Sequence, residues 1–500
     1  MTGLNGNVVG RGAAYIFIET MVGFLSGVFL WLVLTRITSS EVIGTSSTVI
    51  SLATIFTIVA AIGIPEGVSR FLSKSFHEKN VVKAGVFLKA SLILICIGIV
   101  ASTILLWLLK DRISVFQSDP DLVISAIIII GFSALGTLFY STILATLKTK
   151  ISSMIMVIAS CSRTAVVVIL VMTDLGAFGI VIGYAFGEVI ACLLLAIAIS
   201  RVLRREEKSK SDMKLDYPLK TVLTASVPYW IPKLVAILGG ANLGTVVVFG
   251  SNGSTEAASY FLANSILSAI LATVTPLYGI AYPALSAMDD GRKRFAWRII
   301  KIGTIISVPL ALSILFYSNP IIDILGQNYS EASLFLKILL ITVIPSSVSI
   351  MVIQLSYAYG NYRRVLYLGL ASSIPRTLLY FILVPSFGGA GAATSFLIGA
   401  MISFVLSTIV AKKIGLIIHW RDLGLIVIIS LLSAFLFSYF EINFVLGIIG
   451  SIVISLVAFL RFKILSRSDV QEMINVLPEG MAMRLSLLMN KVGSVLNKDY

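Results

Sequence analysis

Residues 122–147 read LVISAIIIIGFSALGTLFYSTILATL and contain no charged side chain. As an α-helix this stretch is about 39 Å long at 1.5 Å per residue, and the hydrocarbon core of a bilayer is about 30 Å thick. Inside lipid every backbone N–H and C=O must be paired within the chain itself, and a helix meets that requirement. The stretch therefore predicts a helix that crosses a membrane.

The rest of the chain has the same character. Of its 500 residues, 58% are hydrophobic and 12% are charged, and the mean hydropathy is +1.01. Soluble globular chains carry about 25% charged residues, so the expected fold class is an all-α polytopic membrane protein. Apolar windows predict about fourteen membrane helices, at 11–34, 43–64, 86–109, 122–147, 151–172, 177–200, 221–249, 257–280, 298–317, 333–357, 364–385, 389–411, 422–439 and 442–460.

Lysine and arginine are distributed unevenly between the two sides of these predicted helices. Thirty of them fall on the side that carries both termini, and three, Arg36, Lys110 and Arg112, fall on the other side. Because loops rich in Lys and Arg stay in the cytoplasm, both termini are predicted to be cytoplasmic in a multi-pass protein of the plasma membrane. The net charge of +14 then reflects topology, and no nucleic-acid partner is expected.

Residue types suited to enzyme or metal chemistry do not stand in suitable patterns. The three cysteines lie in apolar segments and the two histidines are far apart, which argues against a disulfide framework and against a zinc site. A membrane glycosyltransferase or polymerase needs a larger outer domain than the short predicted outer loops provide. The sequence therefore argues against an enzyme, and no cofactor or metal is expected.

The sequence repeats itself at a spacing of about 213 residues. Arg163-Thr164 aligns with Arg376-Thr377, and Gly176-Ala177 aligns with Gly389-Ala390 at the same offset. Six predicted helices separate the two copies, so both halves have one orientation, as in parallel-repeat transporters. A static scaffold that arose by gene duplication is the alternative. The predicted domains are two six-helix lobes at 1–206 and 207–413, helices 13 and 14 at 414–462, and a cytoplasmic amphipathic tail at 463–500.

Two segments near the N-terminus resemble a known family. LTRITSSEVIG at 34–44 is similar to the loop between the first two helices of polysaccharide exporters and flippases, and GIPEGVSRFL at 63–72 is similar to the end of their second helix. These proteins belong to the multidrug/oligosaccharidyl-lipid/polysaccharide superfamily, whose flippase branch has fourteen helices and whose multidrug (MATE) branch usually has twelve.

This resemblance implies a flippase that moves a polyprenyl-(di)phosphate-linked oligosaccharide from the cytoplasmic to the outer leaflet by alternating access. Its product would serve cell-surface polysaccharide or glycoprotein synthesis. The implied partners are the lipid-linked oligosaccharide, membrane lipid and glycosyltransferases of the same pathway, and a monomer is expected. A cation-coupled multidrug or small-molecule exporter of the same fold is the alternative function.

Several ionisable residues fall inside predicted helices, where each costs about 2.5–3.5 kcal/mol at bilayer depth unless it has a partner or water. Among them are Glu19, Arg163, Glu188, Lys233 and Arg376. Arg163 and Glu188 are expected at similar depth on adjacent helices, either as a structural ion pair or with Arg163 facing the substrate. The second repeat has Met401 at the position of Glu188. Arg376 is therefore expected to meet water, a phosphate, or carbonyl groups freed near Pro375.

Glu19 and Lys233 occupy nearly equivalent positions in predicted helices 1 and 7, which line the central cleft from opposite lobes in the resembled family. We expect Lys233, helped by Arg376 or Arg163, to bind the diphosphate. Glu19 is expected to pair with Lys233 when the cleft is empty or to couple transport to H+ or Na+. A permanent Glu19–Lys233 salt bridge between the lobes is the alternative.

The seventh predicted helix contains Pro228, Pro232 and Gly239-Gly240. Each proline removes a backbone hydrogen bond, and glycines tolerate a break in the helix. The segment therefore predicts a bent helix beside the cleft, which suits a moving gate.

Overall fold

A computed structural model of the protein consists almost entirely of α-helices. It describes residues 6–78, 80–206, 218–288 and 290–464, and these ranges contain no β-strand. The all-α fold class predicted from the sequence is confirmed. The predicted amphipathic tail at 463–500 lies outside the described residues from 465 onward.

Eleven helices among the described residues are long and apolar enough to cross a membrane, or up to 13 if two bent pairs of shorter helices each form one span. One of the eleven, α17 (Tyr362–Ile414), has 53 residues and would measure about 80 Å as a single straight helix. Its backbone is not helical at Gly388 (φ 53°, ψ −135°). The prediction of fourteen spans counts the segments before and after this break separately.

Contacts between Cα atoms divide the chain into two compact units, each assembled from separate segments of the sequence. These units are defined by contacts, whereas the two lobes predicted at 1–206 and 207–413 are defined by sequence repetition. The two lobes stay a prediction. Unit 1 consists of Met1–Ala269, Ile322–Leu339 and Gly369–Ile402, and unit 2 consists of Ile270–Ile321, Leu340–Leu368 and Ser403–Tyr500.

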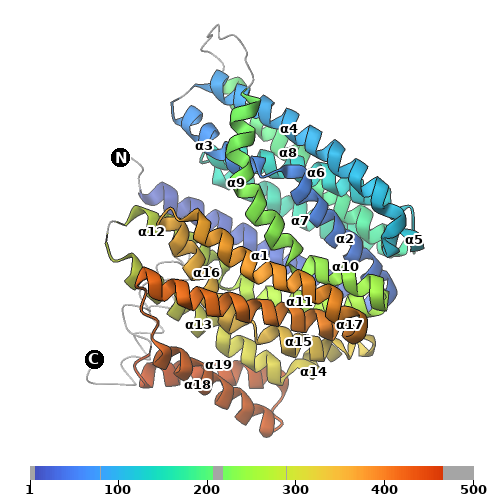
Figure 1. Ribbon diagram of the computed structural model, residues 1–500. Coiled ribbons are helices and arrows are strands. Elements are labelled where there is room, and N and C mark those ends of the chain that lie inside the picture. The colour runs from blue at the N-terminus through green and yellow to red at the C-terminus, as the bar shows by residue number, and fades with distance from the viewer. Residues whose placement is uncertain (1–5, 79, 207–217, 289, 465–500) are drawn as a thin grey trace. The chain divides into compact units, whose positions relative to one another are not determined.

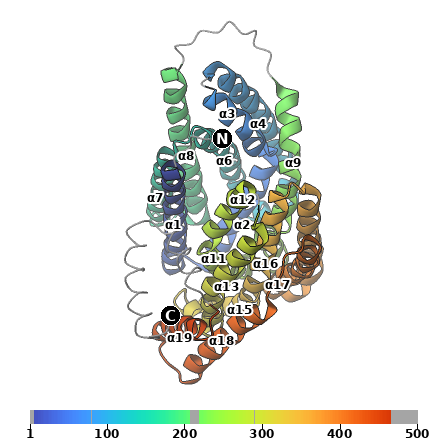
Figure 2. The same ribbon diagram turned by 90° about the vertical axis from the view of Figure 1, so that its left-hand side faces the viewer.

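Unit 1 contains the first ten helices, parts of three later ones and the last two residues of α14 (Ser318–Asp323). Within it α1, α7 and α8 pack side by side, α6 packs against α8 and α2, and α3 packs against α4, α6 and α9 (Figures 1 and 2). The helices are α1 (Gly6–Ile37), α2 (Ser40–Ala61), α3 (Ile64–His77), α4 (Val81–Leu109), α5 (Ser114–Ser118), α6 (Leu122–Ala145), α7 (Thr149–Val171), α8 (Gly176–Glu206), α9 (Leu219–Leu238), α10 (Ala241–Asn252), most of α11 (Ser254–Ala272) and α15 (Ala332–Leu340), and the middle of α17.

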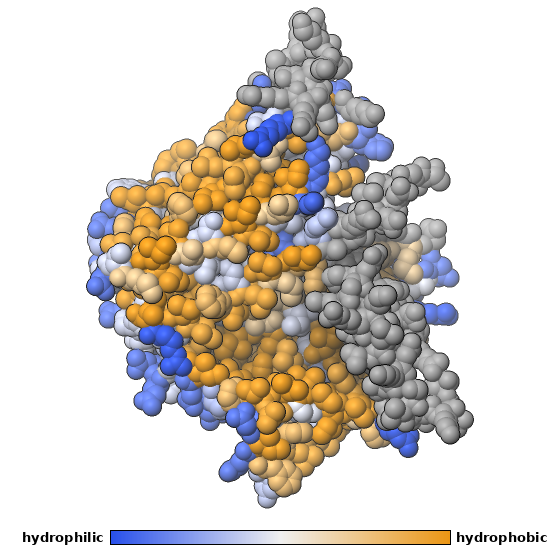
Figure 3. All heavy atoms as spheres, turned by 180° about the vertical axis from the view of Figure 1, so that it is seen from behind, coloured by the Kyte–Doolittle hydropathy of each residue, from blue (hydrophilic) through white to orange (hydrophobic). Residues whose placement is uncertain are grey.

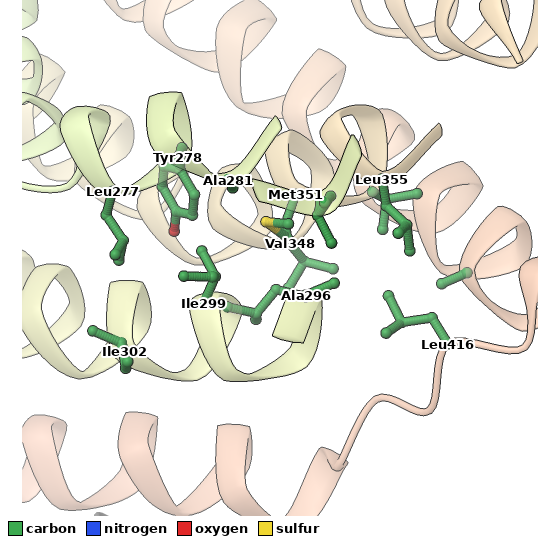
Figure 4. Packing of buried hydrophobic residues seen from close by; sticks show 14 of the residues in the cluster. Leu277, Tyr278, Ala281, Ala296, Ile299, Ile302, Val348, Met351, Leu355 and Leu416 are labelled. Atoms are coloured by element: carbon green, nitrogen blue, oxygen red, sulfur yellow. The ribbon is translucent and has the colours of Figure 1, made fainter. Parts of the chain in front are cut away.

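Unit 2 is arranged around α13 (Arg292–Phe316), which packs against four other helices. These are α12 (Thr275–Ala287), α16 (Val343–Ala358), α18 (Trp420–Tyr439) and α19 (Phe444–Arg461). Figure 4 shows buried side chains of α12, α13 and α16 meeting in one hydrophobic core. Tyr278 of α12 lies against Gly303 of α13, where an added Cβ would come within 2.9 Å of the phenol Cζ, so this contact requires glycine.

The last two helices are joined to α13 and to each other by pairs of hydroxyl groups. Ser313 of α13 and Ser451 of α19 lie 2.7 Å apart, as do Ser433 of α18 and Ser455 of α19. Hydrogen bonds of this kind hold helices together in lipid, where there is no hydrophobic drive for association. They attach the predicted extra pair of helices to unit 2.

Hydrophobic side chains cover most of the face drawn in Figure 3, and hydrophilic ones gather at its margins. Large apolar side chains such as Leu108 and Tyr439 are each 70% exposed. Soluble proteins rarely expose apolar surface on this scale, so the surface agrees with a protein that faces lipid.

Candidate functional site

The turn between α2 and α3 has an unusual backbone. Ile62 and Gly63, the two residues between the helices, both have left-handed φ angles, 49° and 66°. A β-branched residue rarely adopts this conformation, because its Cβ comes too close to a carbonyl oxygen. The chain therefore turns sharply, and α3 begins with Pro65 and Glu66 in its first turn, a position at which proline suits a helix.

Helix α9 packs closely against this turn. A Cβ added at Gly67 would come within 2.6 Å of the Cα of Ser226, and one at Gly63 within 2.6 Å of the carbonyl oxygen of Ser226. Trp230 of α9 donates its indole N–H to the carbonyl oxygen of Ile58 in α2, at 3.0 Å. Two glycines of the GIPEG segment thus permit an approach that a side chain would prevent. We call residues 58–67 and 226–233 the α3–α9 junction.

Lys233 of α9 forms an ion pair with Glu66 of α3 in this junction. The two side chains are 51% and 34% exposed, so a ligand can reach them. A pair of this kind contributes roughly 0–1 kcal/mol to stability where water reaches it.

Glu19 of α1 does not pair with Lys233. Tyr140 of α6 and Ser153 of α7 donate hydrogen bonds to its Oε2, at 3.2 and 2.8 Å. The Glu19–Lys233 salt bridge considered from the sequence is thus absent here, because each residue has another partner. A carboxylate and two hydroxyls offer only oxygen atoms, which suits a proton or a hard cation such as Na+.

Arg163 of α7 lies over the ring of Tyr184 in α8, with 4.7 Å between the guanidinium carbon and the ring centre. A Cβ at Gly187 would come within 2.7 Å of the Arg163 Cβ, so this glycine makes room for the arginine. Glu188 accepts a 2.8 Å hydrogen bond from Ser133 of α6. The ion pairs among the described residues do not include Arg163 with Glu188, so the structural pair expected there does not form.

Arg376 of α17 has the corresponding surroundings in the second repeat. Its guanidinium carbon is 4.0 Å from the ring centre of Phe396, and a Cβ at Gly399 would come within 2.6 Å of its Nε. The aromatic residue and the glycine each follow their counterparts in the first repeat by 212 residues, whereas the arginines are 213 apart. The turn between the arginine helix and the aromatic helix, α7 and α8 in the first repeat and the two parts of α17 in the second, is thus one residue shorter in the second repeat.

The shorter turn corrects the alignment of the two repeats. Gly176 and Gly388 both have left-handed φ angles, 54° and 53°, and are therefore equivalent, in place of the Gly176–Gly389 match made from the sequence. The residue equivalent to Glu188 becomes Ala400 rather than Met401.

Each of the four predicted site residues lies in unit 1 and contacts different neighbours. No described hydrogen bond or ion pair joins two of the four. Glu66 was missed by the sequence analysis, although it stands inside the GIPEG segment. Tyr140 and Ser153 were missed as well, because single hydroxyl residues in apolar helices carry no distinguishing pattern. Among residues the structure describes, no group of three or more His, Cys, Asp or Glu could hold a metal ion.

The described residues form an all-helical polytopic membrane protein with ionisable contacts between its helices, and comparison with known proteins identifies its family. Residues 9–289 match the family described as polysaccharide biosynthesis protein. This match spans more than half of the chain, so the protein belongs to that family. No curated protein sequence matches the chain.

Solved structures similar to this chain include a flippase and multidrug transporters. The lipid II flippase MurJ in an inward closed conformation has a TM-score of 0.71 at 15% identity, covering 90% of this chain and 99% of its own. An inward-facing MATE multidrug resistance transporter of the MOP superfamily has 0.59 at 16% identity, covering 82% and 98%. A MOP superfamily transporter from Pyrococcus furiosus has 0.58 at 15% identity, covering 81% and 96%. The similarity confirms the expected fold.

Proposed function

We propose that the protein is a flippase that moves a polyprenyl-(di)phosphate-linked oligosaccharide from the cytoplasmic to the outer leaflet by alternating access. The observation that carries this proposal is the match of residues 9–289 to the polysaccharide biosynthesis family. The fold similarity to a lipid II flippase over 90% of this chain supports it. The protein then acts as a monomer in the plasma membrane, with both termini in the cytoplasm, beside glycosyltransferases of its pathway.

Lys233 is the cation that receives the diphosphate in this mechanism. The diphosphate as a whole carries about two negative charges, against one on the Glu66 carboxylate, and so attracts the ammonium group more strongly. The substrate therefore displaces Glu66 from Lys233. Once the ion pair is broken, α9 is held less firmly to α3, and it moves more easily at the break between α9 and α10.

The other site residues have supporting roles in the proposal. Arg163 and Arg376 are the further candidate cations for the diphosphate, each fixed over an aromatic ring. Glu19, with its two hydroxyl donors, is the proposed site for the coupling ion, H+ or Na+. Protonation of Glu19 or binding of Na+ neutralises its charge, and neutral groups cross apolar surroundings at lower cost.

The test is flipping of a lipid-linked oligosaccharide in reconstituted vesicles. Lys233→Ala is expected to lower the rate by roughly tenfold or more, since a lost hydrogen bond to a charged group costs about 1.5–3 kcal/mol. Lys220→Ala is the matched control, because Lys220 is an exposed lysine on the same helix. A wild-type rate for Lys233→Ala contradicts the proposed role of Lys233.

A charge exchange separates binding from packing. The double variant Lys233→Glu with Glu66→Lys retains an ion pair at the junction but removes the ammonium group from α9. We expect it to remain stable and inactive. Recovery of flipping in this variant shows that the junction needs only the ion pair, and contradicts direct phosphate binding by Lys233.

The alternative function is export of small molecules coupled to a cation, and the fold shared with MATE transporters favours it. A deletion strain distinguishes the two functions. Accumulation of lipid-linked oligosaccharide on the cytoplasmic leaflet supports the flippase, whereas drug sensitivity with normal polysaccharide supports the exporter.

A further inference from the structure

The segment that joins α17 to α18 in unit 2 combines exposed cations with exposed apolar side chains. Helix α17 ends with Lys412-Lys413 in its last turn, and Arg421 lies in the first turn of α18. These three cationic side chains are exposed. Between them, Ile417 is 71% exposed and Trp420 is 52% exposed. We call residues 412–421 the α17–α18 corner.

The corner has a defined conformation, which directs these apolar side chains outward. Gly415 has a left-handed φ of 79°, and the N–H of Leu416 bonds back to the last turn of α17 at 2.9 Å, an ending typical of helices. Leu416 is 4% exposed and points into the hydrophobic core of unit 2 (Figure 4). The ring of His419 lies against Trp297 of α13, with 4.9 Å between the ring centres. Ile417, between these two anchored residues, therefore remains on the surface.

Lys293 of α13 adds a cation from a distant part of the chain. Its Nζ lies 3.0 Å from the position of a Cβ added at Gly415, so the ammonium group is directly at the corner. The ion pairs among the described residues include neither Lys293 nor any Lys or Arg of the corner. Segments 290–294 and 412–422 together contain six Lys or Arg and two Asp. The corner thus presents more positive charge than the described part of the chain neutralises.

A membrane surface matches this combination of side chains. The excess of Lys and Arg in cytoplasmic loops accounts for the sign of the charge, but that rule places no apolar side chains beside the cations. The cytoplasmic leaflet carries anionic headgroups that attract basic segments, and its acyl chains begin just below them. Tryptophan is enriched at this level of a bilayer. Cations beside an outward isoleucine and tryptophan therefore fit a lipid better than they fit a soluble anion.

We propose that the α17–α18 corner and Lys293 bind the headgroup of an anionic phospholipid in the cytoplasmic leaflet. The exposed Lys and Arg side chains donate hydrogen bonds to the phosphate oxygens, while Ile417 and Trp420 lie against the acyl chains. Because the cations come from α13, α17 and α18, the bound lipid holds these helices together and stabilises unit 2. The site lies in unit 2, whereas Lys233 lies in unit 1, and the inference does not depend on the flippase function.

Thermal unfolding of the full chain in a neutral detergent tests the proposal without any transport measurement. The protein is titrated with dioleoylphosphatidylglycerol, and the Tm is followed by circular dichroism. The wild-type Tm is expected to rise and to saturate, because a ligand that binds the folded state stabilises it. Phosphatidylcholine with the same acyl chains, and inorganic phosphate alone, should not produce this saturable rise.

A triple variant assigns the effect to the corner. Lys412→Gln, Lys413→Gln and Arg421→Gln together should weaken the apparent affinity for phosphatidylglycerol by roughly fivefold for each charge, or about 100-fold in all. These side chains are exposed, so the folded state should tolerate the change.

The matched control removes equal charge from exposed cations of unit 1 that are predicted to lie on the same side of the membrane. Lys148→Gln, Lys150→Gln and Arg201→Gln together should leave the affinity for phosphatidylglycerol unchanged.

Phosphatidylglycerol brominated in its acyl chains detects the contact directly, because bromine quenches nearby tryptophan. The part of the fluorescence that Trp420→Phe removes should be quenched more strongly by brominated phosphatidylglycerol than by brominated phosphatidylcholine. Trp107 of α4 is the control, since it is also 52% exposed but lies outside the corner. The part that Trp107→Phe removes should be quenched equally by both lipids.

Four outcomes overturn the proposal. An equal rise in Tm with phosphatidylcholine would show that the headgroup is not recognised, and an equal rise with inorganic phosphate would show that a soluble anion suffices. An equal loss of affinity in the two triple variants would show that overall charge, and not the corner, attracts the lipid. Displacement of brominated phosphatidylglycerol from Trp420 by polyprenyl diphosphate would assign the corner to the transported substrate.

Discussion

Gly67 shows how a single missing side chain positions the charged residues beside it. It faces the backbone of α9 at Ser226, and the neighbouring Glu66 thereby comes within reach of Lys233. The ion pair and the close packing are thus two consequences of one short segment.

The variant Gly67→Ala is expected to lower the Tm, because a Cβ 2.6 Å from the Cα of Ser226 forces α3 and α9 apart and overpacking costs about 1–3 kcal/mol. The measurement is thermal unfolding of the purified protein. Gly85→Ala in α4 is the matched control, since nothing lies within 4 Å of its Cβ position. It should leave the Tm unchanged or raise it, because alanine favours a helix by up to about 1 kcal/mol over glycine. Equal Tm values for both variants would argue against the close approach.

The sequence identified Lys233 as a cation at membrane depth but not its partner. Glu66 follows a proline in the first turn of a helix, where carboxylates are common because they interact favourably with the helix dipole. That local explanation left no reason to look for a contact 167 positions away. Arg163 and Glu188 illustrate the opposite error, because similar depth on adjacent helices does not fix the direction of long side chains.

At the scale of the element, α17 is held in its broken shape by another helix. Glu256 of α11 accepts a 2.7 Å hydrogen bond from the backbone N–H of Gly389, where the second part of α17 begins. The carboxylate lies so close to Gly388 that an added Cβ would come within 2.6 Å of Oε2. The residue at the break must therefore adopt a left-handed φ and must lack a side chain, and glycine meets both conditions.

Gly388→Ala is expected to lower the Tm more than Gly369→Ala, a substitution in the same helix with no atom within 4 Å of the Cβ position. The left-handed backbone alone costs alanine about 1 kcal/mol, and the collision with Glu256 adds to it. Combined with Glu256→Ala, the loss should be smaller than the sum of the single losses, because the collision is removed. Strictly additive losses would show that the two residues do not interact.

The hydropathy pattern predicted the position of this break to within a few residues, but it did not predict which residue has the left-handed φ. Gly388 and Gly389 are both glycines, and only the backbone angles tell which one is left-handed. In the seventh predicted helix a bend was expected from Pro228, Pro232 and Gly239-Gly240. The two prolines lie inside α9, and the helix ends at Leu238, directly before the two glycines. At this end Thr377 donates a hydrogen bond to the carbonyl oxygen of Leu238, a contact that the local sequence does not reveal.

For the whole molecule, the fold class followed from composition alone, because a chain with this much apolar surface must pair its backbone in helices within lipid. The division into two compact units did not follow from it. Each unit gathers segments from several parts of the chain, and such long-range packing leaves no trace in a hydropathy profile. The sidedness rests on charge alone, and it makes a direct prediction.

Single cysteines in a cysteine-free background test this sidedness in intact cells. Asp111→Cys and Asp174→Cys should react with a membrane-impermeant thiol reagent. Their turns lie on the side opposite the excess of Lys and Arg, which places them outside. Lys148→Cys and Arg363→Cys should react only after the membrane is opened. All four residues are exposed on the protein, so burial does not account for a difference. The reverse pattern would invert the proposed orientation and exclude cytoplasmic termini.

The left-handed backbone at Ile62 also has a consequence for the energy of a conformational change. This geometry costs a β-branched residue about 1–2 kcal/mol, and it persists here while Gly63 and Gly67 lie against α9. Withdrawal of α9 would let Ile62 adopt a right-handed geometry. The strain at Ile62 is then released when the α3–α9 junction separates, and this release offsets part of the cost of breaking the contacts.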